Sequence, residues 1–295
     1  MLRALRINRQ PKNNVLGSAP IPTEHLDRDP TIPISFKQLN SLPENTKERI
    51  YRSLLPPELM RHYNIDPITW KSPDSSQPVR LTANPDTSSV EISLHSDKIH
   101  PDNLFELQLS DNYSNRVELG FMQVNDPDSP RYDIEFDEAG RPTLLGTARR
   151  NKVEEEKAML GGLAPGQTRS GLRTSEMVFE HLETFLVTLG HQEYFLEPLT
   201  YASAWLFERR GFAYIQGHKL MNEVQVEFQP GGRLHSALDG STLFRQPDQW
   251  QTVRGRAWAI HDGVLDSIDA RWDGLRMVKQ IGKCAGVNSF PDAIY

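Results

Sequence analysis

The chain has 295 residues, enough for one large domain or two ordinary ones, and 37% of them are hydrophobic and 24% charged. Its 33 basic and 39 acidic residues give a net charge of -6. This balance argues against a nucleic-acid partner, since such proteins neutralise phosphates with clustered Lys and Arg. The single cysteine, Cys284, excludes an internal disulfide and a zinc-binding thiolate cluster, and we expect it to be a small buried side chain.

No apolar run approaches the roughly 20 residues needed to cross a bilayer. The basic start, Met1-Leu-Arg-Ala-Leu-Arg, is not followed by an apolar signal core. These features predict a cytoplasmic protein with no membrane partner. The histidines have no metal-ligand spacing, so we expect no metal site.

The N-terminal third is predicted to have three parts. Residues 1–34 contain five prolines and little periodicity, which predicts an extended arm that is either mobile or laid across another surface, such as a second subunit. Residues 35–87 form a helical segment and a linker. A helix is predicted over residues 46–55, a second short helix begins at Pro57, and the Ser-, Pro- and Asp-rich residues 71–87 form the linker.

Strict alternation of apolar and polar residues begins after residue 87. The apolar members of the four runs are Val90, Ile92 and Leu94; Phe105, Leu107 and Leu109; Val117, Leu119 and Phe121; and Tyr132, Ile134 and Phe136. Turn residues separate the runs, so the pattern predicts an antiparallel meander with one buried face. The charged stretch from Gly146 to Gly162 predicts a short surface helix or a mobile loop whose charges are solvated.

A long amphipathic helix is predicted to follow a small-residue loop. Apolar residues recur at three- and four-residue steps up to Leu189, and Gly190 is a typical helix-ending glycine. The first turn of a helix presents unpaired N–H groups and a positive dipole end, so the loop could hold a pyrophosphate; a plain helix N-terminus with two surface arginines is the alternative. The candidate cofactor-binding residues are Gly166, Gln167, Thr168, Arg169, Ser170, Gly171, Leu172 and Arg173.

Two short strands and one helix are predicted next. Glu193–Glu197 is a short apolar run ended by Pro198, which is typical of a buried strand. Residues 201–210 form a helix, and Gly211 leads into another strand over residues 212–215.

Two stretches of this region resemble the GNAT superfamily of acyl-CoA-dependent N-acyltransferases. The run Ala204-Trp-Leu-Phe-Glu-Arg-Arg-Gly-Phe212 is similar to the family's A-x-x-L-Y-E-x-x-G-F helix-to-strand signature. The segment 168–178 stands where the family has its R/Q-x-x-G-x-G/A pyrophosphate loop and long helix. The resemblance implies an α+β fold over residues 88–230, with a largely antiparallel central sheet flanked by helices. Residues 231–295 exceed the family's usual core and are expected to pack on it as a C-terminal extension.

The resemblance also implies a function. The chain would bind acetyl-CoA or another acyl-CoA as cofactor and transfer the acyl group to a small-molecule amine. Phe207, however, occupies the position where most members carry the tyrosine that protonates the departing thiolate, and phenylalanine cannot donate a proton. The alternative is therefore a catalytically inactive GNAT-fold protein that binds a ligand or acts as an oligomeric scaffold.

Other side chains are candidates for catalysis. Glu193 and Glu197 could activate an amine through water, and Tyr201 is a candidate replacement for the missing tyrosine. His191 could act as a base or simply follow the helix end. A hydrolase site built from Ser241 with His235 or His261 lacks the sequence context of a nucleophile.

The sheet is predicted to continue beyond residue 223. Val224, Val226 and Phe228 alternate and continue it, and residues 253–260 are a further strand. Residues 275–281 are predicted to form a short helix. The apolar tail, residues 289–295, is expected to dock on the core or on a neighbouring subunit, which with the N-terminal arm makes a homo-oligomer the predicted assembly.

Overall fold

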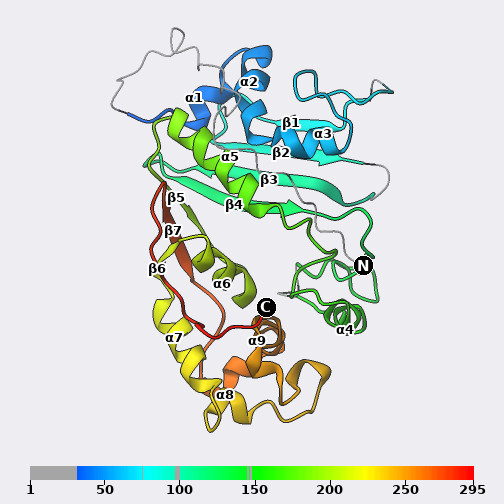
Figure 1. The fold of residues 1–295 in the computed structure, drawn as a ribbon, viewed down its shortest axis with the longest axis vertical. Helices are drawn as coiled ribbons and strands as arrows, with labels where there is room; N and C mark the ends of the chain where they lie inside the picture. Colours follow the sequence, from blue (N-terminus) through cyan, green and yellow to red (C-terminus); the bar gives the residue numbers. More distant parts are fainter. Residues whose placement is uncertain (1–31, 75, 97–99, 145, 147) are drawn as a thin grey trace. The chain divides into compact units, whose positions relative to one another are not determined.

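The computed structural model describes residues 32–74, 76–96, 100–144, 146 and 148–295. The chain is α+β, and seven strands and several helices lie within these residues (Figure 1). It divides into two compact units. Unit 1 comprises the described residues up to Pro127 together with Gly171–Tyr194, and unit 2 comprises Asp128–Ser170 and Phe195–Tyr295.

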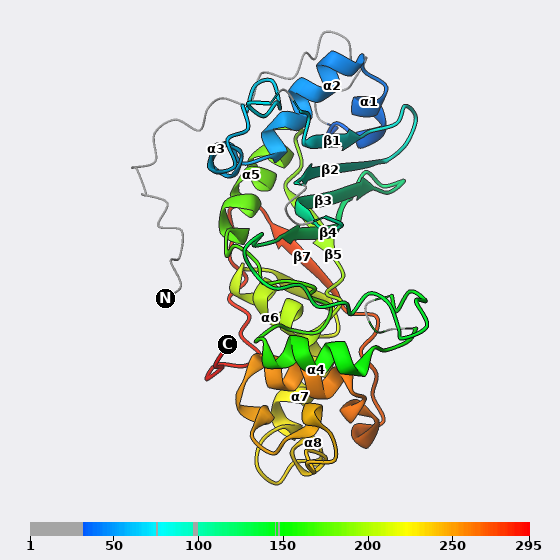
Figure 2. The ribbon, with the colours of Figure 1, turned by 90° about the vertical axis from the view of Figure 1, so that its right-hand side faces the viewer.

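Unit 1 is built on an antiparallel sheet in which neighbouring strands follow chain order (Figure 2). Its strands are β1 (Val79–Thr82), β2 (Ser89–His95), β3 (Asn103–Asp111) and β4 (Val117–Val124). In the register of these strands, Ile92 lies opposite Leu107 and Leu94 opposite Phe105. Both pairs are buried on one face, so the predicted meander is confirmed for its first three apolar runs.

Helices complete the core of unit 1. They are α1 (Phe36–Asn40), α2 (Glu44–Tyr51), the 3-10 turn η2 (Arg52–Leu54), α3 (Pro57–His62) and α5 (Ser175–Thr188). The rings of Phe36 and Tyr51 pack on Phe185 of α5, with centroids 6.5 and 5.9 Å away. Gly190 ends α5 with φ +92°, and the carbonyl of Leu189 accepts a hydrogen bond from the backbone N–H of Ile34. The helix and its glycine are thus as predicted, whereas residues 1–31 of the predicted arm lie outside the described residues.

Strand β5 (Glu193–Leu196) contributes residues to both units, and unit 2 contains the rest of the chain's elements. The helices of unit 2 are α4 (Lys152–Leu160), α6 (Tyr201–Arg209), α7 (His218–Glu227), α8 (Arg233–Ser236) and α9 (Val253–His261), with 3-10 turns η4 (Leu243–Arg245), η5 (Gln249–Gln251) and η6 (Val264–Ile268). Its strands β6 (Ala213–Gln216) and β7 (Arg276–Gln280) pair antiparallel. The predicted strand, helix and strand between residues 193 and 215 are therefore confirmed.

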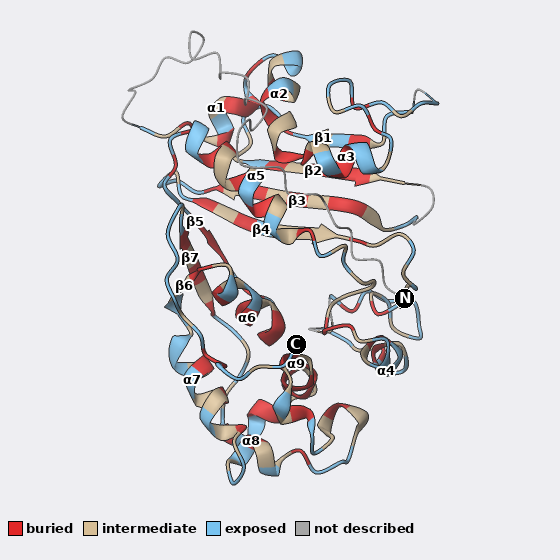
Figure 3. Ribbon diagram, viewed as in Figure 1, coloured by how far each residue is buried: buried red, intermediate tan, exposed pale blue. Residues whose placement is uncertain are grey.

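The core of unit 2 surrounds α9, which is buried along nearly all of its length (Figure 3). Ala257 and Ile260 of α9 belong to a cluster that includes Ala204 of α6 and Val224 of α7. The C-terminal tail lies against the same unit: Phe290 is buried in this cluster, and the carbonyl of Ile294 accepts a hydrogen bond from the N–H of Val253. The tail thus docks on its own chain.

Three predicted elements of the C-terminal region have the wrong type. Residues 224–228 lie in α7 and at its end, because Met221, Val224 and Phe228 are buried at helical spacing while Val226 is exposed. Residues 253–260 form α9, which is buried around most of its surface, Arg256 included, so its sequence shows no polar stripe of helical period. Residues 275–281 contain the strand β7. Its alternation of buried and less buried residues cannot be recognised in the sequence, because one of the buried residues is the charged Lys279.

Other predictions are also corrected. The predicted linker at residues 71–87 contains β1. The fourth apolar run, residues 132–136, is not a strand. The backbone N–H of Tyr132 donates to the carbonyl of Thr168, the N–H of Ile134 donates to the carbonyl of Tyr132, and Phe136 forms an isolated bridge. Cys284 is exposed, not buried.

Candidate functional site

The predicted cofactor loop is divided between the two units. Its first five residues, Gly166–Ser170, belong to unit 2 and are engaged locally. The Gln167 side chain accepts from the Ala164 N–H at 2.8 Å, Thr168 accepts from Tyr132 N–H, and Arg169 donates from Nη1 to the Ser129 carbonyl at 2.6 Å. These contacts order the segment around its own neighbours.

The last three loop residues, Gly171, Leu172 and Arg173, lie in unit 1 at the end of β4. The Leu172 N–H donates to the Val124 carbonyl at 3.2 Å, and Gly171 forms an antiparallel bridge with Asn125. A Cβ on Gly171 would lie 3.1 Å from the Val124 oxygen, so glycine permits this close approach. The chain between β4 and α5 therefore departs into unit 2 and returns to the residue where β4 ended.

The N-terminus of α5 is not capped by its own N-cap side chain. Arg173 has φ +59° and an exposed side chain, and Thr174 makes no capping hydrogen bond. Thr174 is only 8% exposed, and its Oγ1 has no hydrogen-bond partner among the described residues. The N-terminus of a helix carries the positive end of its dipole, so α5 places positive potential beside Arg173. Anionic oxygens suit such a position.

The candidate catalytic residues differ in their exposure to solvent. Glu193 at the start of β5 and Glu197 just after it are exposed. Tyr201 is buried, its hydroxyl lies 3.4 Å from Nη1 of Arg256, and burial raises the pKa of its phenol. Phe207 packs on the ring of Phe212, 5.3 Å away. Tyr201 is therefore enclosed in the core of unit 2.

His191 is a buried structural side chain. Its Nε2 lies 3.0 Å from the carbonyl oxygen of Ile34, so this nitrogen carries the proton and donates. Burial lowers the pKa of the imidazole. These contacts fit the alternative interpretation, in which His191 is a polar residue that follows the end of α5.

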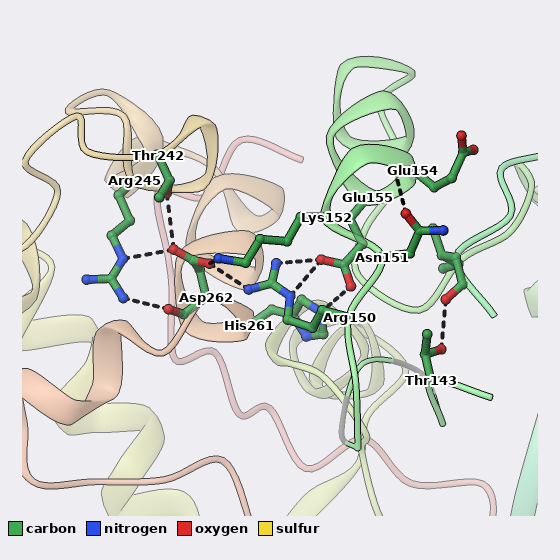
Figure 4. Close-up of polar contacts among 11 residues, drawn as sticks. Thr143, Arg150, Asn151, Lys152, Glu154, Glu155, Thr242, Arg245, His261 and Asp262 are labelled. Carbon is green, nitrogen blue, oxygen red and sulfur yellow. Dashed lines mark hydrogen bonds and ion pairs between the residues drawn. The ribbon is translucent and has the colours of Figure 1, made fainter. Parts of the chain in front are cut away.

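A buried charged network occupies unit 2 where the sequence predicted a solvated surface (Figure 4). Arg150 donates from Nε to Glu155 at 2.7 Å and from Nη1 to Asp262 at 2.5 Å. Arg245 donates from Nε to the other Asp262 oxygen at 3.0 Å, and His261 Nε2 lies 3.2 Å from Glu155. The Glu155 and Asp262 side chains are 3% and 5% exposed. The solvated-face interpretation of residues 146–162 is wrong for Arg150 and Glu155, because tertiary packing supplies buried partners for their charges.

Both carboxyl groups of this network remain ionised at neutral pH. Burial by itself would raise the pKa of Glu155, but hydrogen bonds from His261 and Arg150 lower it below its usual value. Burial likewise opposes ionisation of Asp262, and Arg150, Arg245 and Thr242 outweigh that effect and lower its pKa. Each carboxylate thus already accepts hydrogen bonds from donors in its own unit, which is typical of an ion-pair network that stabilises the fold. We refer to this network as the clamp.

A row of polar side chains crosses the unit 1 sheet and was not predicted from the sequence. Arg80, Ser93, Glu106 and Gln123 are successive cross-strand partners on β1, β2, β3 and β4. Oγ of Ser93 lies 2.9 Å from Nε2 of His95, two residues along β2. The polar members of the alternating runs were a usable signal, although only the register shows which of them are neighbours.

Glu106 is held in this row by amide groups. It accepts from Asn103 Nδ2 and Gln108 Nε2, both at 2.7 Å, and from Gln123 Nε2 at 3.3 Å. No cationic side chain forms an ion pair with it within the part of the chain that the structure describes. Neutral amide groups therefore hold its carboxylate in position.

Comparison with protein-family models, with curated proteins and with solved structures finds no match. In the described ranges, no helix is both long and apolar enough to cross a membrane. The same residues include no group of three or more His, Cys, Asp or Glu side chains placed to bind a metal ion.

Proposed function

We propose that the chain is a GNAT-like protein that binds acetyl-CoA or another acyl-CoA at the N-terminus of α5 and transfers the acyl group to an amine. The order of elements along the chain supports this: helices, an antiparallel meander, then, after the segment that contains α4, the elements α5, β5, α6 and β6. The signature-like run from Ala204 to Phe212 forms α6 and the entry to β6, as the resemblance implies.

The observation that carries the proposal is the return of the chain to the end of β4. Through the contact between Leu172 and Val124, α5 begins directly beside the strand end despite the long intervening segment. The positive dipole end of α5 and the exposed guanidinium of Arg173 then offer positive charge to a diphosphate. The buried hydroxyl of Thr174 offers one further donor.

In the proposed reaction, the amine nitrogen attacks the thioester carbonyl carbon, the C–S bond breaks, and the CoA thiolate leaves. The amine must lose a proton, and the thiolate must gain one from a side chain or from water. Glu193, which lies in unit 1 together with α5, is exposed and remains a candidate to accept the amine's proton through water. A water molecule would protonate the thiolate, because Phe207 has no proton to give.

A specific observation favours a second function, ligand binding without catalysis. Tyr201, the candidate replacement for the missing tyrosine, is buried against Arg256, and Phe207 packs on Phe212. A protein with a retained anion-binding helix end and no proton donor would hold the acyl-CoA as a ligand.

Calorimetric titration of acetyl-CoA into the full chain tests binding. We expect a saturable heat of binding. Arg173→Ala should weaken the affinity roughly tenfold, which corresponds to about 1.4 kcal/mol of binding free energy. Arg61→Ala is the matched control, since it removes one exposed arginine of α3 in the same unit and should leave the affinity unchanged. Absence of heat at millimolar acetyl-CoA would overturn the proposal.

Release of the free CoA thiol separates the two functions. With a panel of primary amines, an acyltransferase releases thiol faster than buffer alone, and Arg173→Ala slows this release. Binding without thiol release would establish the ligand-binding function.

A further inference from the structure

The polar row on the unit 1 sheet contains a hydroxyl and an imidazole in direct contact. Ser93 and His95 share one face of β2 because side chains two residues apart point the same way, while Leu94 between them is buried on the other face. The Ser93 Oγ to His95 Nε2 distance of 2.9 Å is within reach of proton transfer. Neither residue belongs to the α5 site.

The surroundings of His95 favour its neutral form. Partial burial and the positive charge of Arg80 lower the pKa of the imidazole, and these effects outweigh that of Glu106, which raises it. A neutral imidazole with its proton on Nδ1 has an unprotonated Nε2 that accepts the Ser93 proton.

Charged groups flank Ser93 on both sides. Arg80 is its direct partner on β1 and Glu106 its direct partner on β3, so their Cβ atoms lie about 5 Å from that of Ser93. An exposed guanidinium beside the hydroxyl can stabilise negative charge that develops on an attacked carbonyl oxygen. The amide-held carboxylate of Glu106 can stabilise the imidazolium that forms when His95 takes a proton.

We propose that Ser93 is the nucleophile, and His95 the general base, of a second site that accepts acyl groups from activated carboxylic esters. Ser93 Oγ attacks the ester carbonyl carbon, and its proton passes to His95 Nε2. The bond from the carbonyl carbon to the alcohol oxygen then breaks, an alkoxide or phenoxide leaves, and the acyl group stays on Ser93 as an ester. The imidazolium of His95 returns its proton to the leaving group or to solvent.

Burial limits the acyl groups that can react. Ser93 is 3% exposed, whereas His95 is half-buried and Arg80 is exposed. The reacting carbonyl must therefore approach over His95 and Arg80, and a short acyl chain fits this approach better than a long one. The inference does not depend on acyl-CoA binding at α5.

Intact-protein mass spectrometry after incubation with p-nitrophenyl acetate tests the proposal, with peptide mapping to locate the acetyl group. We expect an acetyl adduct on Ser93 and release of p-nitrophenolate. Ser93→Ala should abolish this adduct. His95→Gln, which keeps a hydrogen-bonding side chain but cannot act as the base, should slow its formation roughly 100-fold.

Ser110→Ala provides the matched control, because Ser110 lies on the same face of the sheet, on β3, without a histidine partner. It should leave the rate unchanged, and thermal unfolding of each variant checks that the fold is retained. Acetylation confined to lysines or other serines would overturn the proposal, as would an adduct rate that His95→Gln leaves unchanged in a folded protein.

Discussion

The polar row of unit 1 and the charged network of unit 2 use similar side chains with different results. In unit 2, Glu155 and Asp262 are buried and each is bound by cationic side chains. In unit 1, Glu106 is held by neutral amides, and His95 contacts a hydroxyl. The carboxylates of unit 2 are paired within their own network, while the row places the Ser93 hydroxyl, the His95 imidazole and the amide-held Glu106 carboxylate on one sheet face.

The number of charged side chains in a region is therefore a poor guide to its function. A carboxylate already paired with arginines has its bonding capacity satisfied inside the protein, so it contributes to folding. A carboxylate positioned by amides keeps its full charge for a ligand or for a neighbouring base. Four changes test the comparison, from the largest expected effect on stability to the smallest.

Removing Asp262 should have the largest effect. Asp262→Ala removes the carboxylate that Arg245 contacts and leaves the partly buried Arg150 with Glu155 alone, and we expect the free energy of unfolding to fall by about 3 kcal/mol. Urea unfolding followed by tryptophan fluorescence measures this. Lys152→Ala is the control: its ammonium is 60% exposed and 3.9 Å from Asp262, so its loss should change stability by less than about 1 kcal/mol. Equal effects of the two variants would contradict the clamp.

Acid should weaken the network next. The pKa values of Glu155 and Asp262 are lowered in the folded state, so their stabilisation is present above the usual carboxyl values of about 4 and is lost as pH falls through the lower folded values. Unfolding midpoints measured from pH 7 to pH 2 should decline more steeply for the wild type than for Asp262→Asn. Parallel declines would show that this carboxylate does not titrate as described.

Glu106→Gln should affect stability less and chemistry more. The new amide cannot accept from all three neighbouring amides, so about 1 kcal/mol of stability should be lost. The rate of Ser93 acetylation should nevertheless fall, because the charge that stabilises protonated His95 is gone. An unchanged acetylation rate would remove Glu106 from the proposed site.

Thr174→Val should have the smallest effect on stability and the opposite sign. The buried hydroxyl makes no capping bond and has no partner among the described residues, so replacing it should raise stability by up to about 1 kcal/mol. If the hydroxyl binds acyl-CoA, titration calorimetry should show weaker binding by the same variant. A destabilised variant would show that Thr174 does cap α5.

Local patterns predicted those parts of the fold that depend on near neighbours. The three- and four-residue spacing of α5, its closing Gly190 and the Pro57 start of α3 are all short-range signals. The alternation of β2, β3 and β4 is equally local. Residues 224–228 misled because the same apolar residues fit two periods, and the burial of Met221 and exposure of Val226 decide between them.

For the candidate sites, the sequence indicated the loop before α5 and could not show where its parts go. The division of that loop between the two units and the return of Gly171 to β4 depend on contacts between residues far apart in the chain. The pairing of Arg150 with Asp262 is likewise long-range. Such contacts follow from cooperative packing, which no local window contains.

The sequence by itself determined an α+β chain with an antiparallel meander, a long helix ended by glycine and a following strand–helix–strand unit, because near neighbours set backbone periodicity. Only the tertiary structure decided which polar residues meet. Ser93 and Glu106 become neighbours through the register of β2 and β3, and a slip of one residue would turn either onto the other face. That register is fixed by burying Ile92 and Leu107 together, a long-range balance of packing energy that the local pattern does not encode.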